Sequence, residues 1–255
     1  MNPTIPGLHH VTAITAVPQE NLDFYCGVLG LRLVKLTVNF DDPTSYHLYY
    51  GDERGSPGSI MTFFAWPGAP RGRVGPPQLT TTSFAVPQGS PGYWAERLNE
   101  HLVAAQRGEG RFGEEVLTFA DPDGIGLEIV ATPEPGGHVP TAGPVPAEHA
   151  LRGFHSVTLC EEGYEKTARL LTEVMGFRSE GNEGNRFRYR AGAGAFAAAV
   201  RQPSPFAQPR KTRLDTAAFP GSAWRQGQTG FQRARPSSGN VGPKYSPRDA
   251  VYIRR

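Results

Sequence analysis

The sequence of 255 residues lacks the features that mark several large classes of protein. Its two cysteines are too few for a disulfide-stapled domain, and they make the reducing cytoplasm the expected location. No apolar run approaches the roughly 18 residues that a membrane-spanning helix needs. The first residues also lack the basic-then-apolar pattern of a secretory signal. Glycine and proline account for 55 of the 255 residues, which is rich in loops but falls short of fibrous or low-complexity chains.

The last part of the chain has very few acidic residues. Residues 201–255 contain 11 lysines and arginines but only Asp215 and Asp249, whereas residues 1–200 contain 15 basic and 22 acidic residues. The net charge of +2 therefore combines a body of −7 with a tail of +9. Leu, Ile, Val and Phe supply only seven of the 55 tail residues, too few for a packed core. We predict a mostly disordered tail, and we attribute its composition to a shifted reading frame near residues 192–200.

The basic tail is not predicted to bind nucleic acid specifically. Its charges are scattered along the segment rather than arranged in a stripe. Its aromatic residues stand too far apart to form a stacking surface for bases. Adventitious attraction to polyanions is the simpler expectation.

Two segments of the body repeat each other at a fixed distance. Residues 7–12 (GLHHVT) recur as residues 153–158 (GFHSVT), and residues 28–32 (VLGLR) recur as residues 174–178 (VMGFR). Both pairs are offset by 146 positions, so the spacing inside the two copies is the same. We interpret the repeat as an internal duplication.

Each copy is predicted to fold as a strand, a helix and further strands. Residues 8–15 are rich in β-branched and apolar types, as in a half-buried strand. Leu22, Tyr25 and Leu29 then lie on one helical face, and Gly30 follows where a left-handed stop is expected. A related unit begins near residue 80. The other predicted elements are strands at 31–38, 45–50, 60–65, 82–86, 115–119, 127–131 and 182–190, and a helix at 93–103.

The pattern predicts an α+β fold in which repeated βαβββ modules form curled mixed sheets around a cavity. Residues 5–131 hold two modules and form a first domain, and residues 132–150 are a linker rich in proline and glycine. Residues 151–200 hold a third module, which is an incomplete second domain. The tail of residues 201–255 follows.

Several motifs resemble those of the vicinal oxygen chelate superfamily, which contains glyoxalases, bleomycin-resistance proteins and extradiol dioxygenases. They are residues 7–12, 21–25 (NLDFY), 28–31 (VLGL) and 119–124 (FADPDG). The longer stretch 33–64, with its VNFDDP and YHLYYG motifs, resembles the hydroquinone-type ring-cleaving dioxygenases. The resemblance covers residues 5–190 and implies the paired-module fold.

The resemblance also implies a cofactor, substrates and site residues. These dioxygenases are built from four modules and hold Fe(II) with two histidines and one glutamate, a facial triad that leaves positions for substrate and O₂. By resemblance His10 is a metal ligand, His9 is the catalytic proton shuttle, and a hydroquinone or catechol is the small aromatic substrate. Only one of the three equivalent strand positions carries an imidazole, because Ser156 and about Thr81 stand where His10 stands.

The rest of the ligand set is not found where the resemblance places it. The family takes its second histidine and its glutamate from the fourth module, but residues 201–255 contain neither His nor Glu. We therefore expect that this copy lacks its fourth module and is inactive or dependent on a partner, which leaves room for a homo-oligomer.

Two other functions stay open. One is a metal-free module of the same superfamily that sequesters a small aromatic. The weaker one is a glyoxalase-type isomerase, which would need a histidine near Thr81. Glu128, at a position where the superfamily often has a carboxylate ligand, is interpreted as a paired strand residue, and His47 as packing against the sheet.

Overall fold

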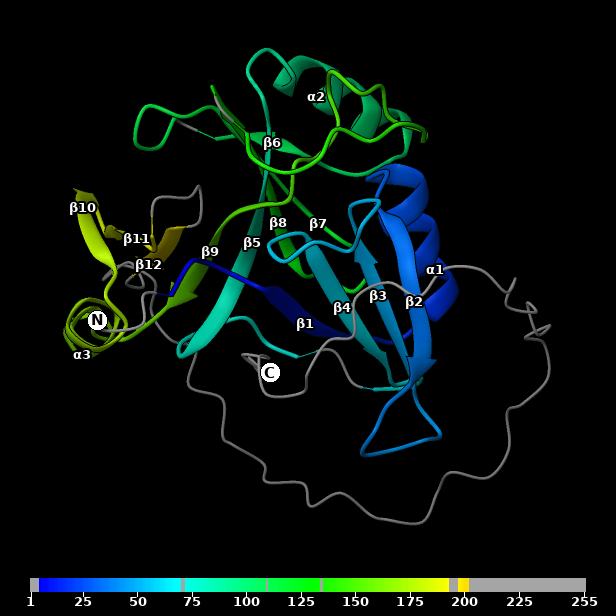
Figure 1. Cartoon of the computed structure of the whole chain (residues 1–255), viewed down its shortest axis with the longest axis horizontal. Helices are drawn as coiled ribbons and strands as arrows, with labels where there is room; N and C mark the ends of the chain where they lie inside the picture. Colours follow the sequence, from blue (N-terminus) through cyan, green and yellow to red (C-terminus); the bar gives the residue numbers. More distant parts are fainter. Residues whose placement is uncertain (1–4, 70–71, 109, 134, 193–196, 202–255) are drawn as a thin grey trace.

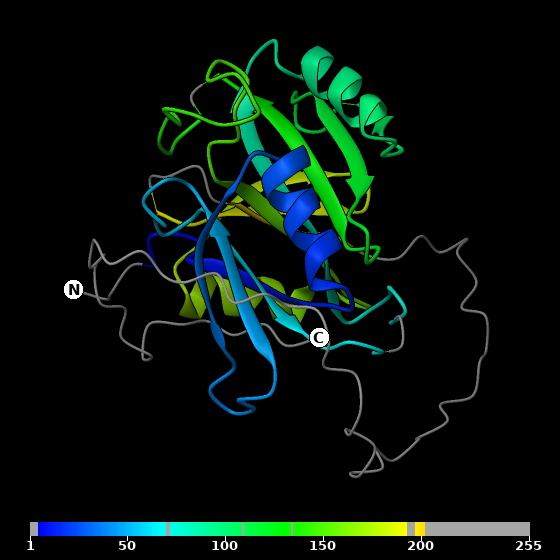
Figure 2. The same ribbon diagram turned by 90° about the vertical axis from the view of Figure 1, so that its right-hand side faces the viewer.

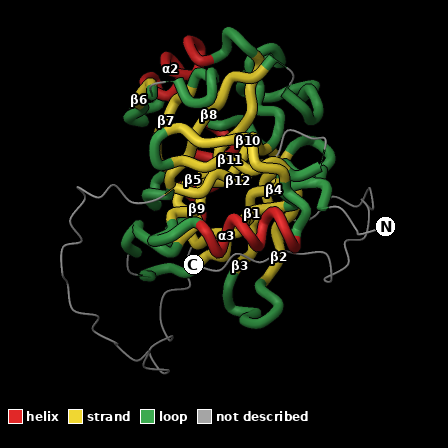
Figure 3. Tube along the Cα trace, turned by 90° about the vertical axis from the view of Figure 1, so that its left-hand side faces the viewer, coloured by secondary structure: helices red, strands yellow, loops and turns green. Residues whose placement is uncertain are grey.

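Two β-sheets form the body of the protein in a computed structural model (Figure 1). Strands make up most of this body and helices little of it (Figure 3), which confirms the predicted α+β class with curled mixed sheets. No helix among the described residues is long and apolar enough to cross a membrane. All but the first residue of the predicted tail lies outside the described residues. The structure describes residues 5–69, 72–108, 110–133, 135–192 and 197–201.

The first sheet is one complete βαβββ unit with the strand order β1-β4-β3-β2. Strands β1 and β4 run parallel, and the other neighbours are antiparallel. The strands predicted after the first helix match β2, β3 and β4 to within one residue. The four strands are β1 (His10–Thr15), β2 (Arg32–Val38), β3 (Tyr46–Gly51) and β4 (Ile60–Ala65).

The second sheet joins two further units in the order β10-β11-β12-β9-β5-β8-β7-β6. The single strand predicted at residues 182–190 is wrong, because Gly184 adopts a left-handed conformation (φ +54°) and turns the chain into the hairpin of β10 and β11. The strands are β5 (Gln78–Pro87), β6 (Gln106–Arg107), β7 (Val116–Ala120), β8 (Gly126–Thr132), β9 (Phe154–Cys160), β10 (Arg178–Glu183), β11 (Arg186–Arg190) and β12 (Ala197–Arg201).

The repeat seen in the sequence is reproduced in the helices. In both copies a short α-helix continues as a π-helix: α1 (Pro18–Leu22) into η1 (Asp23–Val28), and α3 (Glu165–Arg169) into η2 (Leu170–Val174). Gly30 and Gly176 follow these π-helices with the same φ of +73°. Only glycine adopts this conformation without steric cost, which explains why the VLGLR and VMGFR motifs keep it.

These two glycines make a matched pair for mutation. A Cβ at Gly30 would lie 2.8 Å from Cγ2 of Val145, whereas a Cβ at Gly176 would meet nothing within 4 Å. We expect G176A to lower the free energy of unfolding by about 1 kcal/mol through backbone strain alone. We expect G30A to cost about 2 kcal/mol because crowding adds to the strain. Chemical denaturation measures both, and equal losses would contradict the packing argument.

The sheet that joins the second and third units fixes the equivalence of their first strands. Strands β5 and β9 are antiparallel, with Thr81 opposite Thr158 and Ser83 opposite Ser156. A two-fold axis between the two strands would therefore exchange Thr81 with Ser156 and Ser83 with Thr158. The alignment of the repeat then places His10 at the same position in β1, as the sequence predicted.

An apolar core lies between the two sheets. Side chains alternate along each strand, so Val11 and Ala13 of β1 are buried in this core while His10 and Thr12 lie on the opposite face. The helix of α1 and η1 runs beside the first sheet on the side of β7 and β8 (Figure 2). The remaining helix, α2 (Pro91–Glu100), buries Trp94 and Leu98 in the same core.

Candidate functional site

The face of the first sheet that points away from the core is polar, and we call it the first polar face. The strand register places Thr12 of β1 on one side of Thr62 and Tyr49 of β3 on the other side. His47 lies opposite Phe64. The first polar face consists of His10, Thr12, Lys35, Thr37, His47, Tyr49, Thr62 and Phe64.

A chain of hydrogen bonds crosses this face from β3 to β1. The Tyr49 hydroxyl donates to Nδ1 of His47 (2.9 Å), and Nε2 of His47 donates to the Thr62 hydroxyl (3.1 Å). The Thr62 hydroxyl donates in turn to Oγ1 of Thr12 (2.9 Å). With these donors and acceptors, each hydrogen bond of the chain has one proton, and the His47 imidazole is neutral. The chain ends on β1, two residues from His10 and on the same side of the strand.

The environment of His47 disfavours its charged form. Burial is the main cause, and the charge of Lys35 and the ring of His10 add to it, so the pKa of His47 falls to about 4. The sequence interpretation placed His47 as a packing residue, and it does pack against the rings of Tyr49 and Phe64. It is also the centre of the hydrogen-bond chain.

We expect nuclear magnetic resonance to find that His47 titrates near pH 4. Because the folded pKa lies below the unfolded value of about 6.5, neutral His47 favours folding above that value, and this contribution is lost as the pH falls towards 4. K35M should raise the titration midpoint of His47 part of the way towards the unfolded value, because His47 stays buried. K166M, on exposed α3, is the control. A midpoint above pH 6 in the wild type would contradict this account.

His9 and His10 lie together at the beginning of β1. Their Nδ1 atoms are 3.1 Å apart and their rings meet edge to face with centroids 5.2 Å apart. Strict strand alternation would point the two side chains to opposite sides. His9 precedes the first residue of β1, however, so the alternation does not apply to it. Burial, followed by the neighbouring His9, lowers the pKa of His10 and keeps a ring nitrogen available as an acceptor.

The described residues do not assemble a complete metal site. Across residues 5–69, 72–108, 110–133, 135–192 and 197–201, no three His, Cys, Asp or Glu side chains come together as a metal would need. His10 contacts the imidazole of His9 and lies near that of His47. A set of two histidines and one glutamate is therefore not present in this part of the chain.

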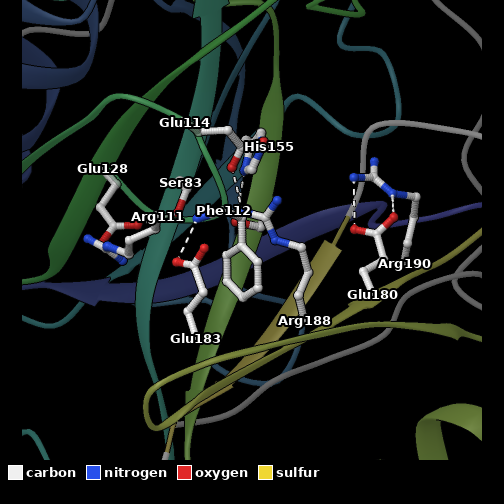
Figure 4. A network of polar contacts seen from close by, with 11 residues as sticks. Ser83, Arg111, Phe112, Glu114, Glu128, His155, Glu180, Glu183, Arg188 and Arg190 are labelled. Carbon is white, nitrogen blue, oxygen red and sulfur yellow. Dashed lines mark hydrogen bonds and ion pairs between the residues drawn. The ribbon is translucent and has the colours of Figure 1, made fainter. Parts of the chain in front are cut away.

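The corresponding face of the second sheet carries ion pairs, and we call it the second polar face (Figure 4). Arg111 contacts Oε1 of Glu128 at 2.6 Å, and the Ser83 hydroxyl donates to Oε2 of Glu128 at 2.8 Å. The interpretation of Glu128 as a paired strand residue agrees with these contacts. Beside them His155 contacts Glu114, which Arg188 also pairs.

Sequence reasoning did not identify the cross-strand partners of either face. Tyr49, Thr62 and Thr12 carry no motif of their own, although the alternation within residues 46–50 and 60–65 shows which of their side chains share a face. Arg111 and Glu114 come from the loop before β7, and no periodic pattern marks them.

Comparisons with known proteins identify the superfamily of the chain. The model of the Glyoxalase/Bleomycin resistance protein/Dioxygenase superfamily matches residues 7–129. The chain belongs to this superfamily. It is 50% identical over 185 residues to the "Putative ring-cleaving dioxygenase MhqO" of Bacillus subtilis (strain 168), which covers 72% of this chain and 59% of that protein. It is 36% identical over 197 residues to the chlorohydroquinone/hydroquinone 1,2-dioxygenase of Sphingobium indicum, covering 76% of this chain and 61% of that protein.

Solved structures have the same fold. The crystal structure of a "putative dioxygenase" from Bacillus subtilis subsp. subtilis str. 168 matches with a TM-score of 0.74 at 47% identity, covering 78% of this chain and 64% of that one. Glyoxalase I from Zea mays has a TM-score of 0.58 at 11% identity, covering 78% of this chain and 68% of that one, which shows the fold alone. The chain spans about three fifths of the length of the curated relatives it matches.

Proposed function

We propose that the chain acts in ring cleavage of a hydroquinone or catechol by O₂, with the first polar face as the aromatic site. One observation carries the proposal: at the position of His10 in β1, the other two equivalent first strands have Ser156 and Thr81, and His10 lies on the same side of β1 as the end of the half-buried chain from Tyr49 to Thr12. The names of the relatives support the same reaction class.

The residues of this face suit a dihydroxylated ring. The rings of Phe64 and His47 are tilted by 32° with centroids 4.0 Å apart, and Trp66 is stacked on Phe64, so a planar substrate would meet aromatic surfaces. Neutral His10 has one ring lone pair, which would bind the proposed metal or, without a metal, accept a hydrogen bond from a substrate hydroxyl. His9, whose Nδ1 lies 3.1 Å from Nδ1 of His10, is the proposed shuttle for the substrate proton.

Fe(II) is the cofactor that the superfamily resemblance implies, and His10 is its proposed ligand in this chain. The described residues do not complete the ligand set, so no step of the reaction is assigned to the metal. Residues 202–255 contain no His and no Glu, so that segment supplies no further ligand of the implied types.

The incomplete ligand set also favours a second candidate function. A module that binds a small aromatic needs only the ring surface and hydroxyl acceptors described above, and it requires no metal. In that case the hydrogen-bond chain would hold a phenolic hydroxyl without any proton transfer.

One experiment distinguishes the two functions. The purified chain is loaded anaerobically with Fe(II), its iron content is measured, and O₂ uptake is followed with hydroquinone or catechol, in parallel with calorimetric binding to the metal-free chain. Ring cleavage predicts substrate-dependent O₂ uptake that is lost in H10A. Binding of the aromatic without O₂ uptake would favour the sequestering module, and neither binding nor uptake would overturn both.

A further inference from the structure

The second polar face contains a serine, a histidine and a carboxylate in hydrogen-bond contact. Nδ1 of His155 lies 3.0 Å from Oγ of Ser156, and Nε2 of His155 lies 3.1 Å from Oε1 of Glu114. Arg188 pairs with the other oxygen of Glu114. This order, hydroxyl to imidazole to carboxylate, is the arrangement that activates a serine as a nucleophile.

The hydrogen-bond partners of the neutral His155 ring favour one of its two tautomers. Burial opposes ionisation of Glu114, but hydrogen bonds from His155 and Arg188 outweigh it and lower the pKa of Glu114 to about 2. An ionised Glu114 can only accept, so Nε2 of His155 carries the hydrogen. Nδ1 is then an acceptor for the Ser156 hydroxyl, which is the tautomer that a general base requires.

The three groups border a hollow whose lining includes three arginines and two glutamates. Both Ser156 and His155 line it. Arg111, Arg186 and Arg188 line the same hollow, with Phe112 stacked against the Arg188 guanidinium at 4.0 Å. Guanidinium groups favour negative charge that develops on a carbonyl oxygen.

We propose that Ser156, His155 and Glu114 form a second, nucleophilic site that is acylated by small carboxylic esters. Oγ of Ser156 forms a bond to the ester carbonyl carbon while Nδ1 of His155 takes the hydroxyl proton. The carbon–oxygen bond to the alcohol then breaks, and His155 returns the proton to the leaving oxygen. Water hydrolyses the acyl-serine by the same proton path and releases the acid. No oxidant or metal takes part, so the proposal is independent of ring cleavage.

A second serine–histidine pair in the chain provides an internal comparison. Oγ of Ser90 lies 3.2 Å from Nδ1 of His149, and the His149 ring is stacked on Tyr93. Ser90 is buried, and it does not line the hollow of the second polar face. The contact between serine and imidazole alone is therefore present twice, whereas the carboxylate and the hollow accompany only Ser156 among the described pairs.

The test is acylation of the full chain by 4-nitrophenyl acetate. We expect a burst of one equivalent of 4-nitrophenolate and one acetyl group on the peptide that contains Ser156, identified by mass spectrometry. S156A should abolish the burst and the adduct, while S90A should keep both. E114Q should slow the burst by roughly 100-fold or more, because the imidazole loses its orienting anion.

A further variant tests the role of the imidazole. H155Q should lose both the burst and the acetyl group on Ser156. If E114Q fails to fold, the wild type and S156A still decide the question, because S156A removes a single hydroxyl. Acetylation of lysine or histidine side chains at equal rates in the wild type and S156A would overturn the proposal.

Discussion

Replacing Arg111 by methionine is expected to lower the free energy of unfolding by about 3–5 kcal/mol, the usual cost of removing one partner of a buried ion pair. The guanidinium contacts Glu128 at 2.6 Å, and the two side chains are only 21% and 5% exposed. Methionine fills most of the volume but leaves the Glu128 carboxylate with the Ser83 hydroxyl as its one side-chain donor among the described residues. The loss therefore arises from an uncompensated buried charge rather than from a cavity.

Two comparisons test that explanation by chemical denaturation. R107M breaks the pair of Arg107 with Glu115, whose atoms are 3.8 Å apart and whose side chains are 60% and 51% exposed. An exposed pair of this kind should cost less than about 1 kcal/mol. The double variant R111M/E128M removes both charges and should recover much of the stability lost in R111M. If R111M and R107M cost the same, the ion pair on the second polar face does not carry the stability assigned to it.

The fold was largely predictable because the information it needs is local and repeated. A strand rich in β-branched residues, a helical face with Leu22, Tyr25 and Leu29, and a glycine stop at Gly30 each agree with the others. The second copy repeats them at the same spacing, so one unit predicts the next. The error at residues 182–190 arose where this pattern weakens, in a hairpin whose β10 is exposed throughout.

The sites were less predictable because their contacts cross strands. Whether Tyr49 meets Thr62 depends on the register of β3 and β4, and a bulge near Leu33 shifts the register on the neighbouring edge. The repeat identified His10 as a special position, since Ser156 stands at the equivalent place in the second copy. It gave no sign that Glu114, 41 residues from His155 in the chain, is its partner, because loop positions follow no period.

Replacing Asp121 by asparagine is expected to remove a large part of the pH dependence of stability between pH 4 and 7. Asp121 lies in the turn between β7 and β8 and is buried. One oxygen accepts the N–H of Ile125 at 2.7 Å and the other accepts the Tyr25 hydroxyl at 3.0 Å. Burial is the largest cause of the shift and raises the pKa of Asp121 to about 6, and the nearby Asp123 adds to it.

The direction of the effect follows from the two pKa values. The unfolded chain releases the Asp121 proton near pH 3.8, whereas the folded protein holds it until about pH 6. Between these values the folded state binds more protons, so stability falls as the pH rises, by about 2–3 kcal/mol in all. Asparagine keeps an acceptor for the N–H of Ile125 and has no proton to lose. The free energy of unfolding of D121N should therefore rise relative to that of the wild type by this amount between pH 4 and 7.

A second variant should shift the pH range over which stability falls, instead of removing the pH dependence. The Tyr25 hydroxyl favours the charged form of Asp121, so Y25F should raise the pKa of Asp121 further and shift the fall in stability to higher pH. Urea denaturation at intervals of pH measures all three proteins. If D121N and the wild type differ by a constant amount at every pH, the titration belongs to other carboxylates, and the buried turn between β7 and β8 is not the pH-sensitive part of the fold.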